Sequence, residues 1–162
     1  MSESPATPWP LPGWTAVQPF PFSEIHKAFA GMTGTQGRIV LRYYRKPDGA
    51  LAATAEFGPM SEGAPGLVHG GALLTVLDEA LGAAAWLAGK PVMTARLSTE
   101  FRRGVPVGAT LLVETALRSE RHRLVLLEGR LLGADGALYA AAEGRFMILD
   151  AATQRRILGR SV

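Results

Sequence analysis

Cysteine is absent from the 162 residues, and histidine and charge are scarce. Without cysteine the chain has no disulfide scaffold, thiolate metal site or cysteine nucleophile, which fits a reducing cytoplasm. The three histidines, His26, His69 and His122, lie far apart in the sequence, so we expect no metal site. Charged residues make up only 19% of the chain and apolar ones 48%, a composition that excludes a disordered protein.

Long uninterrupted apolar runs are also missing. The longest weakly polar stretch, residues 66–89, is broken by His69, Asp78 and Glu79, so we expect no membrane span. The first residues have neither the basic segment nor the apolar segment of a secretion signal. We therefore expect a cytoplasmic protein, and its length suits a single domain.

Positive charge is in slight excess, and it is unevenly distributed. The net charge is +3, from 17 basic and 14 acidic residues. Residues 1–89 hold five basic and seven acidic residues, whereas residues 90–162 hold twelve and seven. The arginines of the second half would suit a phosphorylated ligand, although a solvated surface is the more ordinary explanation. We expect no nucleic-acid partner.

The first 36 residues form a proline-rich arm. Six prolines and two tryptophans fall within residues 1–21, a composition that favours irregular structure packed on the rest of the protein. A short helix is expected over 22–31, with Ser23 as its N-cap. The sequence then predicts one domain over 37–150 and a C-terminal tail over 151–162.

Alternating apolar and polar residues predict six strands in this domain. The first two, over 37–45 and 50–57, form a hairpin around a Pro-Asp-Gly turn. The connections between the later strands are too short for parallel crossovers. We therefore expect an antiparallel meander of four strands, over 92–101, 110–119, 122–132 and 138–149.

The hairpin and the meander are separated by one strong helical segment, over 71–88. This segment is apolar around its whole circumference apart from Thr75, Asp78 and Glu79, and a helix of this kind is buried on nearly all sides. A six-stranded antiparallel sheet that curves around a single long helix is the simplest arrangement that covers it. The sequence therefore predicts an α+β fold.

A His-Gly-Gly sequence at the start of this helix is the most informative motif. Two consecutive glycines, Gly70 and Gly71, let the backbone approach a ligand closely, while the N–H groups of the first helical turn lack partners. Such N–H groups at the positive end of a helix stabilise negative charge, such as the oxyanion of a thioester under attack. A glycine pair alone is more typical of a tight turn, so the motif points to chemistry only in combination with the carboxylates of the helix.

Asp78 and Glu79 are the only charged residues of the helical segment. Neither has a basic residue three or four positions away, and burying an unpaired carboxylate raises its pKa toward the range useful for a base. Such groups cluster at functional sites. Two structural alternatives remain open: an ion pair with Arg96 or another arginine of the sheet, or exposure of both carboxylates in a cleft.

These residues resemble the PaaI-like group of hot-dog-fold acyl-CoA thioesterases. The resemblance covers about residues 37–149, and its most specific part is Pro-Gly-Leu-Val-His-Gly-Gly at 65–71 with Leu-Asp-Glu-Ala-Leu-Gly at 77–82. It implies a hot-dog fold and hydrolysis of an acyl-CoA or acyl carrier protein thioester. It also implies a homodimer that pairs its sheets edge to edge, often doubled to a tetramer, with the site at the subunit interface.

The resemblance also implies roles for single residues. Asp78 would act as general base or nucleophile, the N–H of Gly70 or Gly71 would polarise the thioester carbonyl, and His69 would orient the loop. Thr94 stands where the family has a Ser or Thr that holds the attacking water. No cofactor is expected beyond the CoA of the substrate.

Two positions refine these roles. Gly63 stands where some relatives carry an Asn or Gln that binds the carbonyl, which leaves the oxyanion to backbone N–H groups alone. Adjacent helical residues point about 100 degrees apart, so only one of the two carboxylates faces a given thioester. We choose Asp78 as the base and expect Glu79 to contact the substrate.

The remaining substrate contacts are assigned by chemistry. The acyl chain is expected to lie along the helix against Ala72, Ala80 and Ala83. The phosphates of CoA would bind cations at the rim of the site, although each candidate is individually more typical of a solvated surface. These candidates are Arg102, Arg103, Arg121, Arg123 and Arg145.

Two other functions fit the same fold. A non-catalytic hot-dog protein that binds acyl-CoA or another small ligand is the main alternative, as in lipid-sensing regulators. Such a regulator would be expected to carry a helix-turn-helix, whereas residues 1–36 offer at most one short helix. A hydratase would require an Asp/His pair in a different sequence context.

Overall fold

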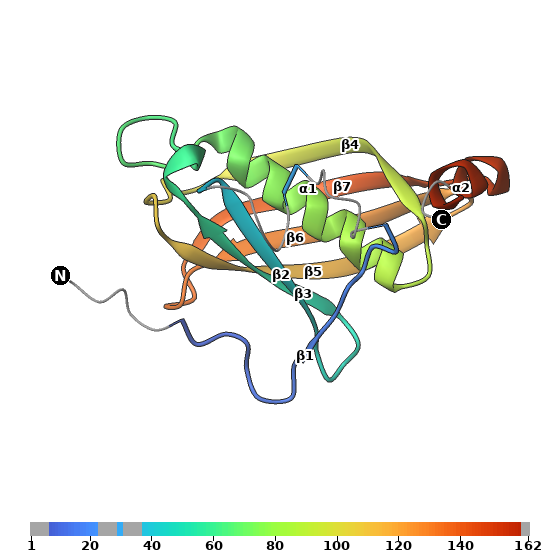
Figure 1. Ribbon diagram of the computed structural model, residues 1–162, viewed down its shortest axis with the longest axis horizontal. Coiled ribbons are helices and arrows are strands. Elements are labelled where there is room, and N and C mark those ends of the chain that lie inside the picture. The colour runs from blue at the N-terminus through green and yellow to red at the C-terminus, as the bar shows by residue number, and fades with distance from the viewer. Residues whose placement is uncertain (1–6, 23–28, 31–36, 160–162) are drawn as a thin grey trace.

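The computed structural model describes residues 7–22, 29–30 and 37–159. Most of the short helix expected over 22–31 lies outside these residues. The described residues form seven strands, two α-helices and one short 3-10 helix (Figure 1). In chain order these are β1 (Thr15–Ala16), β2 (Ile39–Arg45), β3 (Leu51–Phe57), η1 (Pro59–Ser61), α1 (Gly70–Leu87), β4 (Val92–Phe101), β5 (Thr110–Arg121), β6 (Leu124–Leu132), β7 (Leu138–Ile148) and α2 (Ala151–Leu158).

The strands form one antiparallel sheet in the order β1-β2-β3-β5-β6-β7-β4. The six predicted strands are all present, and the arm adds the two-residue β1 at one edge. The predicted four-stranded meander is wrong, because only β5, β6 and β7 follow one another, while β4 pairs with β7 at the opposite edge. Residues 102–109 carry the chain back across the sheet; they must cross three strand spacings of about 4.8 Å, well within the reach of eight extended residues.

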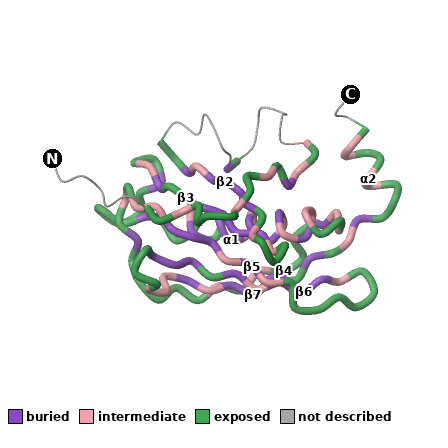
Figure 2. The backbone as a smooth tube through the Cα atoms, turned by 90° about the horizontal axis from the view of Figure 1, so that it is seen from below, coloured by how far each residue is buried: buried purple, intermediate pink, exposed green. Residues whose placement is uncertain are grey.

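Helix α1 lies across the inner face of the curved sheet, as the hot-dog fold predicts (Figure 1). Its residues Val76, Leu77, Ala80 and Leu81 are fully buried, and the purple segments of Figure 2 show that buried residues line the strands around it. The helix has the length and hydropathy of a membrane span. The sheet packed around it makes it the core helix of this domain instead.

Glycines in the sheet bring α1 close to the strands. Gly129 of β6 faces the helix, and a Cβ atom there would lie 3.1 Å from Leu81 Cδ2 and 3.3 Å from Leu77 Cδ2. A larger residue would therefore push the helix away from the strands. This close approach holds α1, and the carboxylates it carries, in a fixed position over the sheet.

The N-terminal arm wraps around the β2 edge of the sheet. Trp9 and Trp14 pack on the outer face, away from α1, against a small cluster of β3, β5 and β6 residues. The arm then pairs with β2 through β1. Beyond β1, Phe20 and Phe22 reach the inner side, where their rings lie 6.3 and 5.3 Å from the ring of Trp86 on α1. The packed arm expected from its two tryptophans is thus present.

The C-terminal tail contains a helix that was not predicted from the sequence. Asp150 caps α2, because its Oδ1 accepts a hydrogen bond from the Thr153 N–H at 2.7 Å. Hydrogen bonding to Thr153 lowers the pKa of Asp150. No residue of α2 is fully buried, and the helix projects from one end of the sheet (Figure 1).

Candidate active site

His69 forms the N-cap of α1. Its Nδ1 accepts a hydrogen bond from the Gly71 N–H at 2.8 Å, and its own N–H donates to the Ser61 carbonyl at 2.8 Å. Gly63 lies against this residue, and a Cβ at Gly63 would be 2.9 Å from His69 Cα. Glycine at position 63 is therefore required by the packing of the cap. The histidine thus caps the start of the helix, and its role in orienting the loop for catalysis stays a prediction.

The cap decides which N–H groups remain available for a ligand. The Gly71 N–H is occupied by His69, and the N–H groups of Ala72 and Leu73 donate to the His69 carbonyl. Gly70 is the first helical residue and has no intrahelical acceptor, and within residues 37–159 its N–H has no other partner. Of the two N–H groups expected to donate to the thioester carbonyl, only that of the exposed Gly70 is therefore available in the described residues.

Asp78 and Thr94, sixteen residues apart, meet between α1 and β4. The Thr94 hydroxyl donates to Asp78 Oδ1 at 2.7 Å. Asp78 is half-buried, Thr94 is exposed, and neither carboxylate oxygen of Asp78 has an ion pair in the described part of the chain. Arg96 is in register with Arg145, beyond the bulge that follows Thr94, and lines the outer face. The structure thus contradicts the suggested ion pair between the helix carboxylates and Arg96.

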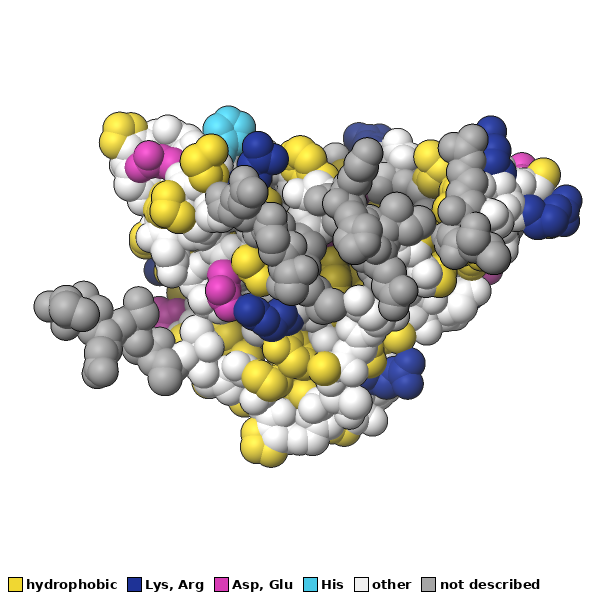
Figure 3. All heavy atoms as spheres, in the orientation of Figure 1, with side chains coloured by type: hydrophobic (Ala, Val, Ile, Leu, Met, Phe, Trp, Pro, Cys, Tyr) yellow, Lys and Arg dark blue, Asp and Glu magenta, His cyan; other side chains and the backbone are white. Residues whose placement is uncertain are grey.

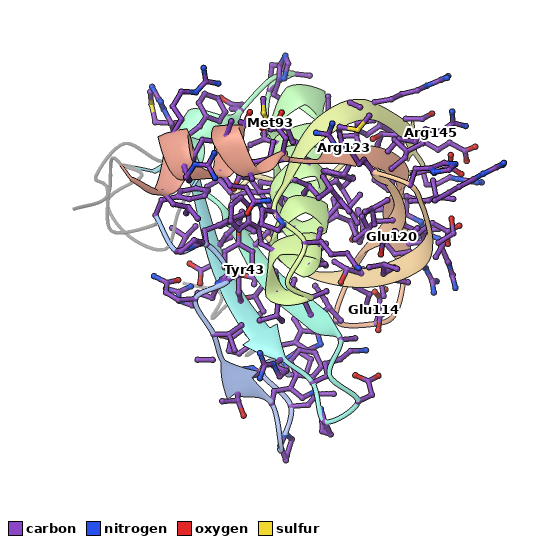
Figure 4. The ribbon with its side chains drawn as sticks, turned by 90° about the vertical axis from the view of Figure 1, so that its right-hand side faces the viewer. Tyr43, Met93, Glu114, Glu120, Arg123 and Arg145 are labelled. Atoms are coloured by element: carbon purple, nitrogen blue, oxygen red, sulfur yellow. The ribbon has the colours of Figure 1, made fainter. Side chains whose placement is uncertain are left out.

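Glu79 points to the other side of α1, toward β2. Burial, and to a lesser degree the charge of Asp78, raises the pKa of Glu79 to about 7. Burial followed by the charge of Glu79 also raises the pKa of Tyr43, whose side chain from β2 lies beside the helix in Figure 4. The two carboxylates therefore occupy different environments, as their helical spacing requires.

Further residues of β4 line the same side of the helix. Beyond the bulge, Thr99 and Phe101 alternate with outward-facing residues. Thr99 Oγ1 is buried and lacks a hydrogen-bond partner in the described structure, and Phe101 is 53% exposed and lies beside Gly70. Sequence reasoning missed both residues. The two-residue period of the strand, counted back from its end, is the signal that could have found them.

The Gly70 N–H and the Asp78 carboxylate belong to one helix but lie far apart. Eight residues separate them, which corresponds to a rise of about 12 Å along the helix axis. Hydrolysis needs a chain of four groups: the base, the water, the carbonyl carbon and the oxyanion donor. Neighbouring groups in this chain lie about 3 Å apart. Three such steps laid end to end span about 9 Å, which is shorter than this rise, and attack on a carbonyl requires a bent arrangement that shortens the reach further.

The candidate arginines are not gathered in one place. Arg102 and Arg103 follow β4 near the start of α1, and Arg102 forms an ion pair with Glu100. Arg121 and Arg123 lie at the opposite end, where Arg123 donates to the Ile148 carbonyl at 2.9 and 3.1 Å. Arg145 lines the outer face of the sheet. Their contact with CoA phosphates stays a prediction.

The alanines of α1 differ in exposure from what contact with an acyl chain requires. Three alanines of α1 were expected to contact the acyl chain. Ala80 and Ala83 are fully buried in the core, and only Ala72 is half-exposed. Among the described residues, the face seen in Figure 3 shows mostly hydrophobic and uncharged side chains, with a few charged ones, of which one basic and one acidic side chain lie next to each other near its middle. The prediction that the acyl chain contacts Ala80 and Ala83 is therefore wrong, because neither side chain is exposed in the single chain.

Known proteins are similar to this chain in sequence. The sequence profile of the thioesterase superfamily matches residues 65–140. An acyl-coenzyme A thioesterase THEM4 from Bos taurus is 38% identical over 94 residues, covering 57% of this chain and 38% of the relative. The chain thus spans much less than two thirds of that curated relative.

Solved structures show the same architecture. The crystal structure of a thioesterase superfamily protein is 33% identical, with a TM-score of 0.63, and the match covers 67% of this chain and 53% of that one. The PaaI protein of E. coli, from the phenylacetic acid degradation operon, is 17% identical with a TM-score of 0.59, and the match covers 62% of this chain and 72% of PaaI. The hot-dog fold is therefore confirmed.

Proposed function

We propose that the chain, which is similar to the thioesterase superfamily over residues 65–140, hydrolyses acyl-CoA thioesters to a free acid and CoA. The observation that carries the proposal is the Asp78 carboxylate, unpaired by any cation in the described residues and bound at 2.7 Å by the Thr94 hydroxyl. The name of the bovine relative supports acyl-CoA as the substrate class.

The chemistry requires a base and an oxyanion donor. With Thr94 bound to Oδ1, the second oxygen of Asp78 is left to accept a proton from water. The water oxygen attacks the thioester carbon, the carbonyl oxygen gains charge and accepts a hydrogen bond from a Gly70 N–H, and the C–S bond breaks. The thiolate of CoA leaves and takes up the proton from Asp78, which restores the base. Direct attack by the carboxylate is the alternative role of the same group.

We propose that this site is assembled from two copies of the chain. Asp78 lies about 12 Å along the helix from the Gly70 N–H of its own chain, too far for one substrate carbonyl to use both. Strand β4 is the open edge of the sheet, whereas β1 covers the β2 edge. Pairing of two β4 edges would bring Asp78 of one subunit toward Gly70 of the partner subunit.

The activity is tested with a panel of acyl-CoA and acyl carrier protein thioesters, followed by release of free thiol in the presence of EDTA. We expect turnover of at least one acyl-CoA by the wild type and its loss in Asp78→Asn. Binding of acyl-CoA esters without turnover by the wild type would instead support the non-catalytic ligand-binding protein. Full activity of Asp78→Asn would overturn the site while leaving the function in place.

The two-subunit site has its own test. Gly70→Pro removes the N–H at the first helical position, where proline is tolerated, and Gly70→Ala keeps it, because the added Cβ meets only Phe101 at 3.7 Å. We expect the proline variant to be inactive and the alanine variant active. Refolding Gly70→Pro together with Asp78→Asn should restore about a quarter of the activity, since half of the dimers then hold one intact site. A mixture without activity would contradict the shared site.

A further inference from the structure

Two exposed apolar side chains flank the Gly70 N–H, which the proposed reaction uses as its oxyanion donor. Phe101, the last residue of β4, is 53% exposed, and its ring would lie 3.7 Å from a Cβ atom at Gly70. Leu74 is 38% exposed and lies about one helical turn after Gly70, on the same side of α1. Leu74 and Phe101 together form the Phe101 wall, an apolar surface beside the donor.

The ring of Phe101 is exposed although it lies on the helix side of the sheet. Phe101 is in register with Ala140 of β7, whose side chain is fully buried. It lies beside the first residue of α1, and this residue, Gly70, has no side chain that could cover the ring. An aromatic ring left in water at such a position indicates that another group covers it in the working protein.

The N–H groups that adjoin the wall are already paired. Those of Arg102 and Arg103 both donate to the Tyr139 carbonyl, at 2.8 and 3.2 Å, and that of Gly71 is occupied by the cap. The pantetheine arm of CoA contains amide groups, which lose hydrogen bonds to water when they are buried against such a surface. An apolar acyl group has no such loss and is stabilised by the same contact. The wall therefore fits the acyl side of a thioester better than the CoA side.

The alanines expected along the acyl chain do not lie beside the Gly70 N–H. Ala80 and Ala83 are buried in the core. Ala72 is two residues from Gly70, so its side chain points about 160 degrees away from that residue around the helix axis. Leu74, four residues from Gly70, points to the same side as the donor. A thioester whose carbonyl oxygen accepts a hydrogen bond from Gly70 thus has its acyl group within reach of the wall.

We propose that Leu74 and Phe101 contact the acyl group of the substrate and select thioesters with bulky apolar acyl groups over acetyl-CoA. The proposal rests on the hydrolysis proposed above and adds the class of acyl group to it. In the two-subunit site, the wall belongs to the subunit that donates the Gly70 N–H. Pairing of β4 edges uses the backbone of the strand and leaves the ring on the helix side, where the substrate lies. Each methylene that covers the wall stabilises the bound acyl group, so specificity rises with its apolar area.

Specificity constants test the wall. kcat/KM is measured for acetyl-CoA, octanoyl-CoA and benzoyl-CoA, and we expect the wild type to prefer the two larger substrates. Phe101→Ala should lower kcat/KM for both of these by about tenfold and leave the value for acetyl-CoA within about threefold. Phe101→Leu keeps an apolar side chain and should retain most of the preference for octanoyl-CoA. Leu74→Ala should act in the same direction with a smaller loss. Leu117→Ala on β5, 41% exposed, is the matched control and should keep all three values.

Binding of non-hydrolysable thioether analogues of acetyl-CoA and octanoyl-CoA separates the wall from the reaction. Calorimetry measures the dissociation constants for the wild type and Phe101→Ala. Tighter binding of the octanoyl analogue that is lost in Phe101→Ala, without turnover of any thioester, would support the wall and contradict the proposed hydrolysis. A wild type that favours neither analogue and no larger substrate would overturn the wall. Equal losses of kcat/KM for all three substrates in Phe101→Ala would overturn it as well.

Mass and thermal unfolding distinguish an acyl contact from a structural one. Light scattering coupled to gel filtration measures the mass of each variant. Because the ring is exposed, we expect Phe101→Ala and Phe101→Leu to keep the mass and the unfolding temperature of the wild type. A smaller assembly in Phe101→Ala would make the ring a subunit contact and overturn its assignment to the acyl group. If Phe101→Ala does not fold, Phe101→Leu with benzoyl-CoA and Leu74→Ala with octanoyl-CoA make the same comparison, and unchanged preferences in both would overturn the wall.

Discussion

The two sides of α1 carry adjacent carboxylates in opposite settings. On the β4 side, Asp78 accepts a hydrogen bond from Thr94 and lies next to an open sheet edge. On the β2 side, Glu79 is half-buried near Tyr43, and partial burial raises the pKa of Glu79 to about 7. The edge beyond it is covered by β1 and the aromatic residues of the arm. A single step along the helix therefore separates an acid beside the open β4 edge from an acid on the side that β1 covers.

The comparison shows how a buried helix can carry chemistry without losing its core role. In the proposed site, a substrate and a partner subunit approach from the open β4 side, where the Thr94 hydroxyl donates to the Asp78 carboxylate. The closed β2 side buries aromatic surface and favours the neutral form of its carboxyl group. We therefore expect substitutions on the β4 side to change turnover and substitutions on the β2 side to change stability.

The largest contrast is expected between the two acids themselves. Asp78→Asn keeps the shape of the side chain and removes the base, so we expect kcat to fall by about a thousandfold. Glu79→Gln should change kcat by less than about threefold at neutral pH, since Glu79 faces β2. Steady-state kinetics with one acyl-CoA measures both. Equal losses in the two variants would show that the acids work as a pair.

Removal of Trp86 tests the β2 side through stability. The Trp86 ring packs against Phe20 and Phe22 and donates through Nε1 to the Val92 carbonyl at 3.3 Å. Trp86→Ala should lower the free energy of unfolding by about 3 kcal/mol. Because Trp86 lies eight residues beyond Asp78, kcat should stay near the wild-type value. Urea unfolding and kinetics on the same samples check this, with Trp86→Phe as the milder control.

Much of the fold could be predicted because its periodicities are strong. The alternation in β2 and β3 and the fully apolar segment of α1 predicted a helix wrapped by a sheet. The position of β4 could not be predicted in this way. Alternation shows that a segment is a strand but not which strand it pairs with, and an eight-residue connection permits either the neighbouring position or the far edge.

The parts of the candidate site formed by residues close together in the sequence could be predicted. The cap by His69 follows from a histidine before two glycines, and the resemblance to known thioesterases placed Thr94 near Asp78 before the structure did. The environment of Glu79 was not predictable, because it depends on Tyr43 of β2, which is distant in sequence. The outward direction of Arg145 likewise depends on the register of β7 with its neighbours.

The pH dependence of stability separates Glu79 from Asp78. Because the pKa of Glu79 is raised to about 7 from an ordinary 4.5, the folded state binds the proton more tightly than the unfolded state. Its stabilising contribution is complete below pH 4.5 and is lost as the pH rises through about 7. Between about pH 5 and pH 8 the wild type should lose up to about 3 kcal/mol relative to Glu79→Gln. Urea unfolding of both proteins across this range measures the difference, and parallel curves would contradict it.

Thr94 gives a smaller effect on the open side. Thr94→Val removes the hydroxyl that donates to Asp78 and keeps the branched shape, so we expect kcat to fall by about tenfold. Thr94→Ser retains the hydroxyl and should stay within about threefold of the wild type. The exposed position of Thr94 makes a large loss of stability unexpected. A drop in unfolding free energy as large as the drop in activity would give Thr94 a structural role instead.

The cap of α1 should show the smallest effect, and it tests whether the open side needs a fixed helix start. His69→Ala removes the acceptor of the Gly71 N–H and should lower the free energy of unfolding by about 1 kcal/mol. His69→Asn supplies another acceptor at the same position and should recover most of this loss. In the alanine variant the Gly71 N–H is freed beside Gly70, so the proposed donor to the thioester carbonyl is no longer fixed to one residue. We expect kcat, measured by steady-state kinetics, to fall in His69→Ala and to recover in His69→Asn. A recovery of stability without recovery of kcat would instead assign the imidazole a direct role in the reaction.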